Sequence, residues 1–216
     1  MSSWSPAEKM NRQYRFQRHI YDATRTHYLL WRSRLISRLN PPPNGVVVEV
    51  ACGTGWNLIR AAQTYPDARF FGLDISSEML ATARSKIGTG GLAHRVKLEQ
   101  GDATSFVLQQ LFDVPSADRI FISYALSMIP NWPDAIARAI ASLSPGGELH
   151  IVDFGRMDHM PASAKWALRR WLKHYNVTPR DDLEKVVRDV AGRGGMNCTF
   201  EQTPSGYAAY CVIKRL

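Results

Sequence analysis

The sequence predicts a single α/β domain with a seven-stranded, mainly parallel sheet and helices on both of its faces. Three observations support this fold class. The chain has 216 residues, of which 45% are hydrophobic and 21% charged, enough for one sizeable core. Strand-length apolar segments alternate with helix-forming segments, the pattern of βαβ units. The first such segment, 46–50, is almost entirely β-branched and apolar, as in a buried parallel strand.

The expected elements follow one another with turn residues between them. A helix is expected over 8–39, which contains no glycine or proline and ends before three successive prolines. Strands are expected over 46–50, 69–73, 95–100, 117–123, 148–154, 199–203 and 207–212, and further helices over 57–64, 76–86, 134–143, 162–175 and 181–191. Ser76 or Ser77 is expected to cap its helix. The last two strands are expected to pair as a hairpin.

Within the single domain 1–216 we distinguish four parts. They are a basic helical segment over the active site (1–40), a cofactor-binding core (41–155), a basic amphipathic helical insert (156–191) and C-terminal strands (192–216). No apolar run is long enough to span a bilayer, and the first residues do not resemble a secretory signal. Three widely spaced cysteines predict reduced thiols in a cytoplasmic protein, and no metal site is expected.

The net charge of +8 is unevenly distributed. Residues 1–40 carry eight basic and two acidic side chains, and residues 156–180 carry six and one. Residues 41–155 are mildly acidic, with eight basic and eleven acidic side chains. Two basic segments around a neutral core favour a polyanionic partner, either a nucleic acid or an anionic membrane surface. For either segment alone, a solvated helix face explains the charge equally well.

A glycine-rich turn lies between the strand 46–50 and the helix 57–64. Gly53 and Gly55 allow a tight turn there, with close approach of a ligand to the backbone. Asp74, nineteen residues after Gly55, ends the second strand, where a carboxylate can accept the hydroxyl hydrogens of a ribose. The pair predicts a nucleoside-cofactor site. A dinucleotide fingerprint would need glycine where Leu58 stands, and no P-loop lysine follows the turn.

The stretch from Glu49 to Gly55 resembles the first motif of class I S-adenosylmethionine-dependent methyltransferases, with alanine in its first small position. Four further segments resemble later motifs in the same order: 72–76, 101–103, 122–124 and 145–149. The resemblance implies S-adenosylmethionine as cofactor and S-adenosylhomocysteine as product. The residues implied to bind it are Glu49, Ala51, Gly53, Gly55, Asp74, Ile75, Met79, Asp102, Ala103 and Ser123.

The helix 162–175 carries an apolar stripe on one face, and on another it carries Trp166 among Arg169, Arg170 and Lys173. This arrangement is typical of a solvated basic face. It is equally typical of an interfacial helix on anionic lipid, with the tryptophan as anchor. After the fourth strand the chain reads Ser-Tyr-Ala-Leu and lacks the Asn/Asp-Pro-Pro-aromatic motif of enzymes that methylate planar amines, so a nucleic-acid partner is less expected.

Residues 10–25 (MNRQYRFQRHIYDATR) resemble the N-terminus of bacterial diacylglyceryl-homoserine N-methyltransferases, and so do 149–155 and 177–180 in their regions. The resemblance implies three methyl transfers to the homoserine amine of a glycerolipid, forming the betaine lipid DGTS. It implies an enzyme that works on the inner face of an anionic membrane. A partner that hands over the substrate, the enzyme that makes diacylglyceryl-homoserine, also becomes conceivable.

Within this hypothesis the chemistry is an in-line displacement, with the amine lone pair aligned on the methyl group. The tyrosines considered for orienting the amine are Tyr21, Tyr14 and Tyr124. The groups considered for holding the substrate are Arg15, Arg18 and Arg25 for its carboxylate and Asp153 for its ammonium. Packing or capping explains each tyrosine and Asp153 about as well. His19 and His150 are possible bases, although a structural role is the better interpretation of both.

Three other functions stay open at this point. A phosphatidylethanolamine N-methyltransferase would share the cofactor site and the basic helices. An RNA methyltransferase would use the positive charge on phosphates. A regulatory domain would bind the cofactor without turnover.

Overall fold

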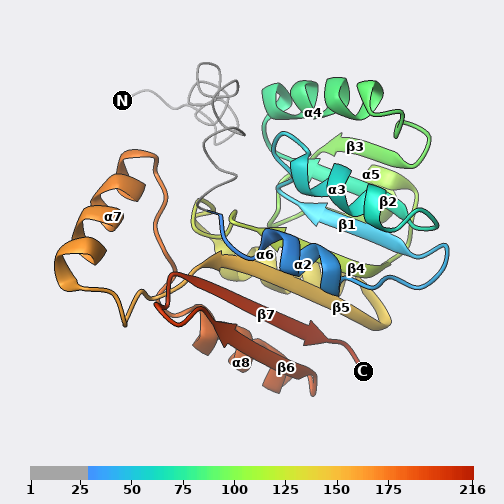
Figure 1. Ribbon diagram of the computed structural model, residues 1–216. Coiled ribbons are helices and arrows are strands. Elements are labelled where there is room, and N and C mark those ends of the chain that lie inside the picture. Colours follow the sequence, from blue (N-terminus) through green and yellow to red (C-terminus); the bar gives the residue numbers. More distant parts are fainter. Residues whose placement is uncertain (1–28) are drawn as a thin grey trace, which may run out of the picture.

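The computed structural model describes residues 29–216, whose strands form one sheet in the order β3-β2-β1-β4-β5-β7-β6 (Figure 1). The strands are β1 (Val46–Val50), β2 (Arg69–Asp74), β3 (Val96–Gln100), β4 (Ala117–Ser123), β5 (Leu143–Phe154), β6 (Asn197–Gln202) and β7 (Ala208–Lys214). Strands β1 to β5 are parallel, and β7 is antiparallel to β5 and β6. The predicted α/β class, the seven mainly parallel strands and the terminal hairpin are confirmed.

Helices cover both faces of this sheet (Figure 1). They are α2 (Arg32–Arg38), α3 (Trp56–Thr64), α4 (Ser77–Thr89), α5 (Leu108–Phe112), α6 (Trp132–Ala141), α7 (Ala162–His174) and α8 (Leu183–Arg193). One hydrophobic cluster joins the sheet to α2, α3 and α4, and the other joins it to α5, α6 and α8. Helix α7 stands away from the sheet, on the side where the parallel strands end (Figure 1).

The central strand β1 shows why its sequence is apolar throughout. Val46, Val48 and Val50 belong to the cluster beneath α5, α6 and α8, whereas Val47 belongs to the cluster beneath α2 to α4. Successive side chains of a strand point to opposite faces, and here both faces are covered. Since β1, β2 and β4 run in the same direction, their carboxyl ends meet at one edge of the sheet. The loops that follow them are thereby brought together.

Two expected boundaries are wrong, and one helix was not expected. A helix begins only at Arg32, because Trp31 has a left-handed conformation with φ of 66°; the expected continuous helix over 8–39 is therefore interrupted, and its first part lies outside the described residues. Strand β5 begins at Leu143 rather than at 148, so it includes the proline–glycine turn. Helix α5 was not expected, since five residues are too short to show a helical period. In the described part of the chain, no helix is long and apolar enough to cross a membrane.

Candidate active site

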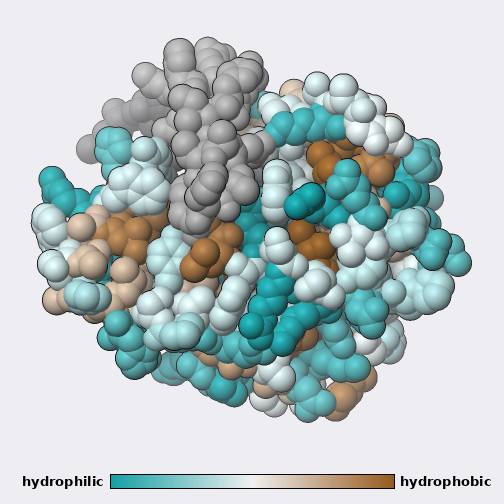
Figure 2. All heavy atoms as spheres, in the orientation of Figure 1, coloured by the Kyte–Doolittle hydropathy of each residue, from teal (hydrophilic) through white to brown (hydrophobic). Residues whose placement is uncertain are grey.

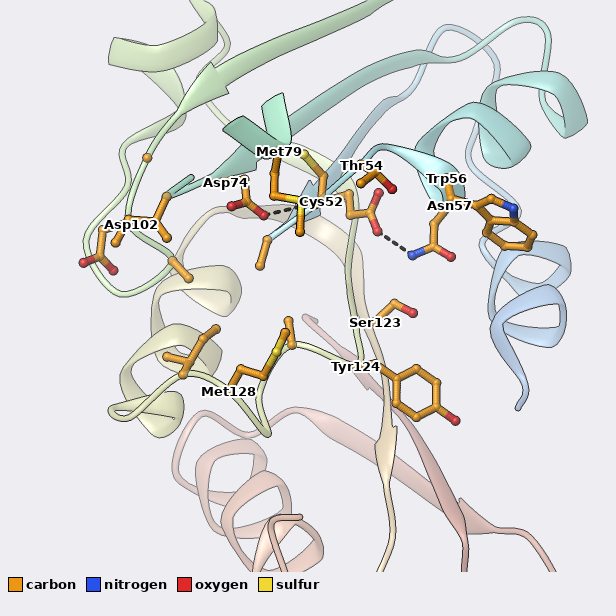
Figure 3. Close-up of a pocket in the computed structure, with 18 of the residues that line it drawn as sticks. Cys52, Thr54, Trp56, Asn57, Asp74, Met79, Asp102, Ser123, Tyr124 and Met128 are labelled. Atoms are coloured by element: carbon orange, nitrogen blue, oxygen red, sulfur yellow. Dashed lines mark hydrogen bonds between the residues drawn. The ribbon is translucent and has the colours of Figure 1, made fainter. Parts of the chain in front are cut away.

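A pocket of about 410 Å³ opens where the parallel strands end. Its wall comes from the loops after β1, β2, β3 and β4, with Asp74 and Met79 on one side and Met128 and Tyr124 across from them (Figure 3). Nine of the ten residues predicted to bind the cofactor line it: Glu49, Ala51, Gly53, Asp74, Ile75, Met79, Asp102, Ala103 and Ser123. Residues from four of the five motifs therefore converge on one cavity, whereas the fifth, 145–149, does not line it.

The two glycines of the β1–α3 turn have different places. Both have positive φ, 54° at Gly53 and 76° at Gly55. A Cβ added at Gly53 would have no heavy atom within 4 Å, so the space beside it is open. A Cβ at Gly55 would lie 3.0 Å from the Cβ of Ala83 in α4. Gly55 is the tenth predicted residue, and it lies behind the pocket wall, where it lets α3 pack closely against α4.

Asp74 ties two of these loops together. One carboxylate oxygen accepts a hydrogen bond of 2.8 Å from the main-chain N–H of Gly53, and the other accepts one of 2.9 Å from Ser76. Ser76 in turn caps α4 as expected, its hydroxyl accepting a bond from the N–H of Met79. Burial raises the pKa of Asp74, against the effect of the main-chain N–H donors. Each oxygen keeps a second lone pair, which a ribose hydroxyl can use.

A buried hydrogen-bonded chain runs from α2 to β1 along the pocket wall. Arg32 donates through Nε to Oδ1 of Asn57 (2.8 Å), and Asn57 donates through Nδ2 to Oε1 of Glu49 (2.7 Å). The guanidinium of Arg32 also lies 3.8 Å from the ring centroid of Trp56, a cation–π contact. The sequence did not single out Arg32, Trp56 or Asn57, although the last two directly follow the glycine turn.

The side chain of Glu49 combines a buried, unpartnered oxygen with a raised pKa. Its Oε2 is buried and has no hydrogen-bond partner in the described part of the molecule. Burial raises the pKa of Glu49 to about 8, although Asn57 and the charge of Arg32 act in the opposite direction. A buried acceptor without a partner is costly. Because Glu49 is also among the residues that line the cavity, its carboxylate is a candidate to accept from a donor of a ligand, and a cationic donor would favour its charged form.

The loop 124–131 forms the opposite wall, which is mainly apolar around Met128. Arg180, from the segment after α7, holds this loop in place. It donates to the main-chain oxygen of Leu126 through Nε (3.0 Å) and to that of Ile129 through Nη2 (2.7 Å). Because a guanidinium presents its donors in a rigid fork, the two bonds fix the loop relative to the chain that follows α7.

Asp153, considered for a substrate ammonium, does not line the pocket. It is buried and accepts hydrogen bonds from the N–H groups of Ser127 (3.2 Å) and Phe154 (2.8 Å), with burial raising its pKa to about 6. The structure thus gives it the capping role, as a support of the loop. Tyr124 does line the pocket, but its hydroxyl donates to the main-chain oxygen of Leu30 (2.7 Å). A role of Tyr124 in orienting the amine stays a prediction.

Several other predicted residues lie outside the described part of the chain: Tyr14, Tyr21, Arg15, Arg18, Arg25 and His19. His150 is not among the residues that line the pocket. Its Nδ1 is 2.7 Å from the hydroxyl of Tyr210, its Nε2 faces Glu148, and burial lowers its pKa. It therefore has the structural role that the sequence favoured.

The four residues considered for a membrane surface all lie on α7, but they are not equivalent. Trp166 is 66% exposed, with Arg170 beside its ring, and Lys173 is also exposed. Arg169 instead pairs with Asp181 and is only half-exposed, and a role of these four residues at a membrane surface stays a prediction.

The fold is the Rossmann-like fold of methyltransferases, and the glycine turn and Asp74 at the end of β2 lie together where the sequence predicted a cofactor site. Residues 47–147 match the family described as a methyltransferase domain. Two similar proteins are the ubiquinone/menaquinone biosynthesis C-methyltransferase UbiE of Paracoccus denitrificans, 31% identical over 74% of this chain, and a demethylmenaquinone methyltransferase of Geobacillus stearothermophilus, 30% identical over 65%. The chain spans 65% and 54% of their respective lengths.

The fold also matches solved structures. One is a phosphoethanolamine N-methyltransferase of Haemonchus contortus in complex with phosphomonomethylethanolamine and S-adenosylhomocysteine, with a TM-score of 0.74 and 14% identity over 98% of this chain and 59% of that one. At this identity the match shows the fold alone.

The pocket fits S-adenosylmethionine on its own geometry. The lone oxygen of Glu49 suits an ammonium, the open space at Gly53 admits close approach, and the carboxylate of Asp74 suits a pair of hydroxyls. Arg32 adds a cation that suits a carboxylate. Within residues 29–216 no group of three or more histidine, cysteine or acidic side chains could hold a metal ion.

Proposed function

We propose that this protein transfers methyl groups from S-adenosylmethionine to the amine of diacylglyceryl-homoserine, three times in succession, and so forms the betaine lipid DGTS. The observation that carries the proposal is the resemblance of residues 10–25 to the enzymes of that reaction. It agrees with a pocket whose two walls differ: one is rich in polar groups suited to the cofactor, and the other is mainly apolar.

The cofactor, when bound, supplies an electrophilic methyl group on a sulfonium. Asp74 would hold the ribose, Glu49 the ammonium and Arg32 the carboxylate of its amino-acid part. These three groups are already fixed by hydrogen bonds to the protein, which lowers the entropic cost of binding.

The apolar wall explains how the acceptor amine loses its proton without a strong base. Among residues 29–216, no basic side chain lines the pocket around Met128 and Ile129, and Asp153 accepts hydrogen bonds from main-chain N–H groups behind the loop. Transfer of an ammonium into such surroundings disfavours its charged form and lowers its pKa. Water or a tyrosine then suffices to carry the proton away.

A second candidate is methylation of a ring carbon of a quinone precursor. It is favoured by the names of the similar proteins, which methylate demethylmenaquinone or act in ubiquinone and menaquinone biosynthesis. A quinone with an isoprenoid tail would also suit an apolar wall, so the pocket alone is compatible with both acceptors.

The test is incubation of the purified protein with methyl-labelled S-adenosylmethionine and vesicles that contain one acceptor each: diacylglyceryl-homoserine, phosphatidylethanolamine or demethylmenaquinol. We expect three added methyl groups on the homoserine lipid and none on the others, by mass spectrometry. Label on the quinol supports the second candidate, and label on phosphatidylethanolamine moves the assignment to that lipid. Either result overturns the first proposal.

A pair of variants checks that the label comes from this pocket. Met128→Trp narrows the pocket at its apolar wall, and it should raise the KM for the lipid with unchanged affinity for S-adenosylhomocysteine. Met160→Trp makes the same change outside the pocket and should leave both quantities unchanged.

A further inference from the structure

Helix α7 is the least integrated element of the described chain. Of its thirteen residues only Leu172 is buried, and the helix stands off the sheet at the edge that holds the pocket (Figure 1). Arg170 and Lys173 follow Trp166 by four and seven residues, so the three side chains share one stripe of the helix. The stripe lies on the side of the helix opposite to Leu168 and Leu172, and therefore faces outward.

The exposed stripe combines an aromatic side chain with free positive charge. Trp166 is 66% exposed, and the guanidinium of Arg170 lies 5.8 Å from its ring centroid. Among the described residues, neither Arg170 nor Lys173 has an acidic partner. The neighbouring bases differ, because Lys165 pairs with Asp158 at 3.5 Å and Arg169 pairs with Asp181. A soluble helix face gains nothing from an exposed tryptophan, whereas the interface of an anionic bilayer suits both groups.

The inward side of α7 lies close to the pocket. Trp171, 41% exposed, lines with Leu172 a small apolar cavity whose inner end is formed by Leu29 and Tyr124. These last two residues also line the large pocket, so the small cavity lies next to it. Figure 2 shows hydrophobic surface on the α7 side of the molecule, next to exposed polar atoms. Apolar and aromatic side chains thus lie between the base of α7 and the large pocket.

We propose that α7 docks the protein on anionic bilayers through Trp166, Arg170 and Lys173, with the small apolar cavity at the base of the helix next to the membrane surface. The proposal deepens the proposed function, since a lipid acceptor must be drawn from a bilayer. The charge complementarity of the stripe identifies the occupant as anionic lipid, and the exposed tryptophan beside the basic side chains favours a bilayer over a nucleic acid.

The test is sedimentation of the full chain with phosphatidylcholine vesicles that contain or lack phosphatidylglycerol, without cofactor or acceptor. Binding is expected only with the anionic lipid, and it should weaken as salt is added. Arg170→Gln with Lys173→Gln should reduce partitioning about 30-fold, at about 1 kcal/mol per basic side chain. Trp166→Ala should reduce it about tenfold. The side chains are exposed, so the Tm should not change.

The matched control removes two exposed positive charges elsewhere, by Lys185→Gln with Arg193→Gln on α8, and should retain most of the binding. Equal loss in the control pair, no binding of the wild type to anionic vesicles, or preferential binding to an RNA oligonucleotide would each overturn the proposal. Because this readout needs no turnover, it stands or fails separately from the identity of the acceptor.

Discussion

Glu49→Gln tests the ionisation of the buried carboxyl at the end of β1. Burial raises its pKa to about 8 in the folded protein, whereas an exposed glutamate titrates near 4.3. Between these values the folded state keeps a proton that the unfolded chain has lost. The free energy of unfolding must therefore fall as the pH rises. Each pH unit corresponds to about 1.36 kcal/mol, so this group accounts for up to about 4 kcal/mol between about pH 5 and 8.

The assay is the Tm of wild type and Glu49→Gln, without ligand, at several values across this range. A loss of about 4 kcal/mol corresponds to roughly 8–16 °C for a chain of this size. We expect the wild-type Tm to fall by this much more than that of the variant, which has no proton to lose at this position. Other buried acids, Asp153 among them, titrate alike in both proteins and cancel. Parallel curves for the two proteins would refute the reasoning.

The same carboxyl makes cofactor binding depend on protons. The ammonium of a bound ligand favours the charged form of Glu49, so binding of S-adenosylhomocysteine near pH 7 should release a proton. Calorimetry in buffers of different ionisation enthalpy measures this release. Wild type should show it and Glu49→Gln should not; its absence from the wild type would mean that the ligand amine does not meet this oxygen.

Three further outcomes follow from the geometry. Gly55→Ala should lower the free energy of unfolding by about 2 kcal/mol or more, because the left-handed backbone and the crowded Cβ both cost energy. Gly53→Ala should lower it by about 1–2 kcal/mol and mainly weaken cofactor binding. Melting curves measure the first effect, and calorimetry of cofactor binding measures the second. Tyr124→Phe should lower stability by about 1 kcal/mol through loss of the bond to Leu30, with kcat changed only a few-fold, and a hundredfold loss of kcat at unchanged Tm would instead make the hydroxyl catalytic. Arg180→Ala should raise the KM for the acceptor with unchanged affinity for S-adenosylhomocysteine, because it frees the apolar loop, and an equal loss of both affinities would contradict this.

The cofactor half of the site could be predicted because its backbone restricts which residues are possible. Gly53 stands at a positive φ beside open space, Asp74 must end a strand to reach the turn, and Ser76 must cap the next helix. These local requirements leave a pattern in the sequence. The β-branched, apolar sequence of β1 likewise predicted a strand covered on both faces.

The remainder depends on contacts between distant segments, which leave no such pattern. The break before α2 occurs at Trp31, a residue type that rarely adopts positive φ, so composition gave no sign of it. Arg32 reaches the pocket only because α2 packs on α3, and nothing distinguishes it from the other arginines of a basic segment. Asp153 lies next to the end of β5, much as Asp74 ends β2, but its oxygens accept hydrogen bonds from main-chain N–H groups.

Helix α2 is held from the opposite end of the chain, since Arg34 and Arg38 both pair with Glu201 of β6 and Leu35 packs in the cluster that contains Tyr210 of β7. During synthesis, the segment that brings a cation to the pocket is made before the strands β6 and β7 that support it. The nascent chain can therefore form the glycine turn well before it can complete the cofactor site. Ligand affinity then becomes a property that a ribosome-bound intermediate acquires only when β6 and β7 have emerged and joined the sheet.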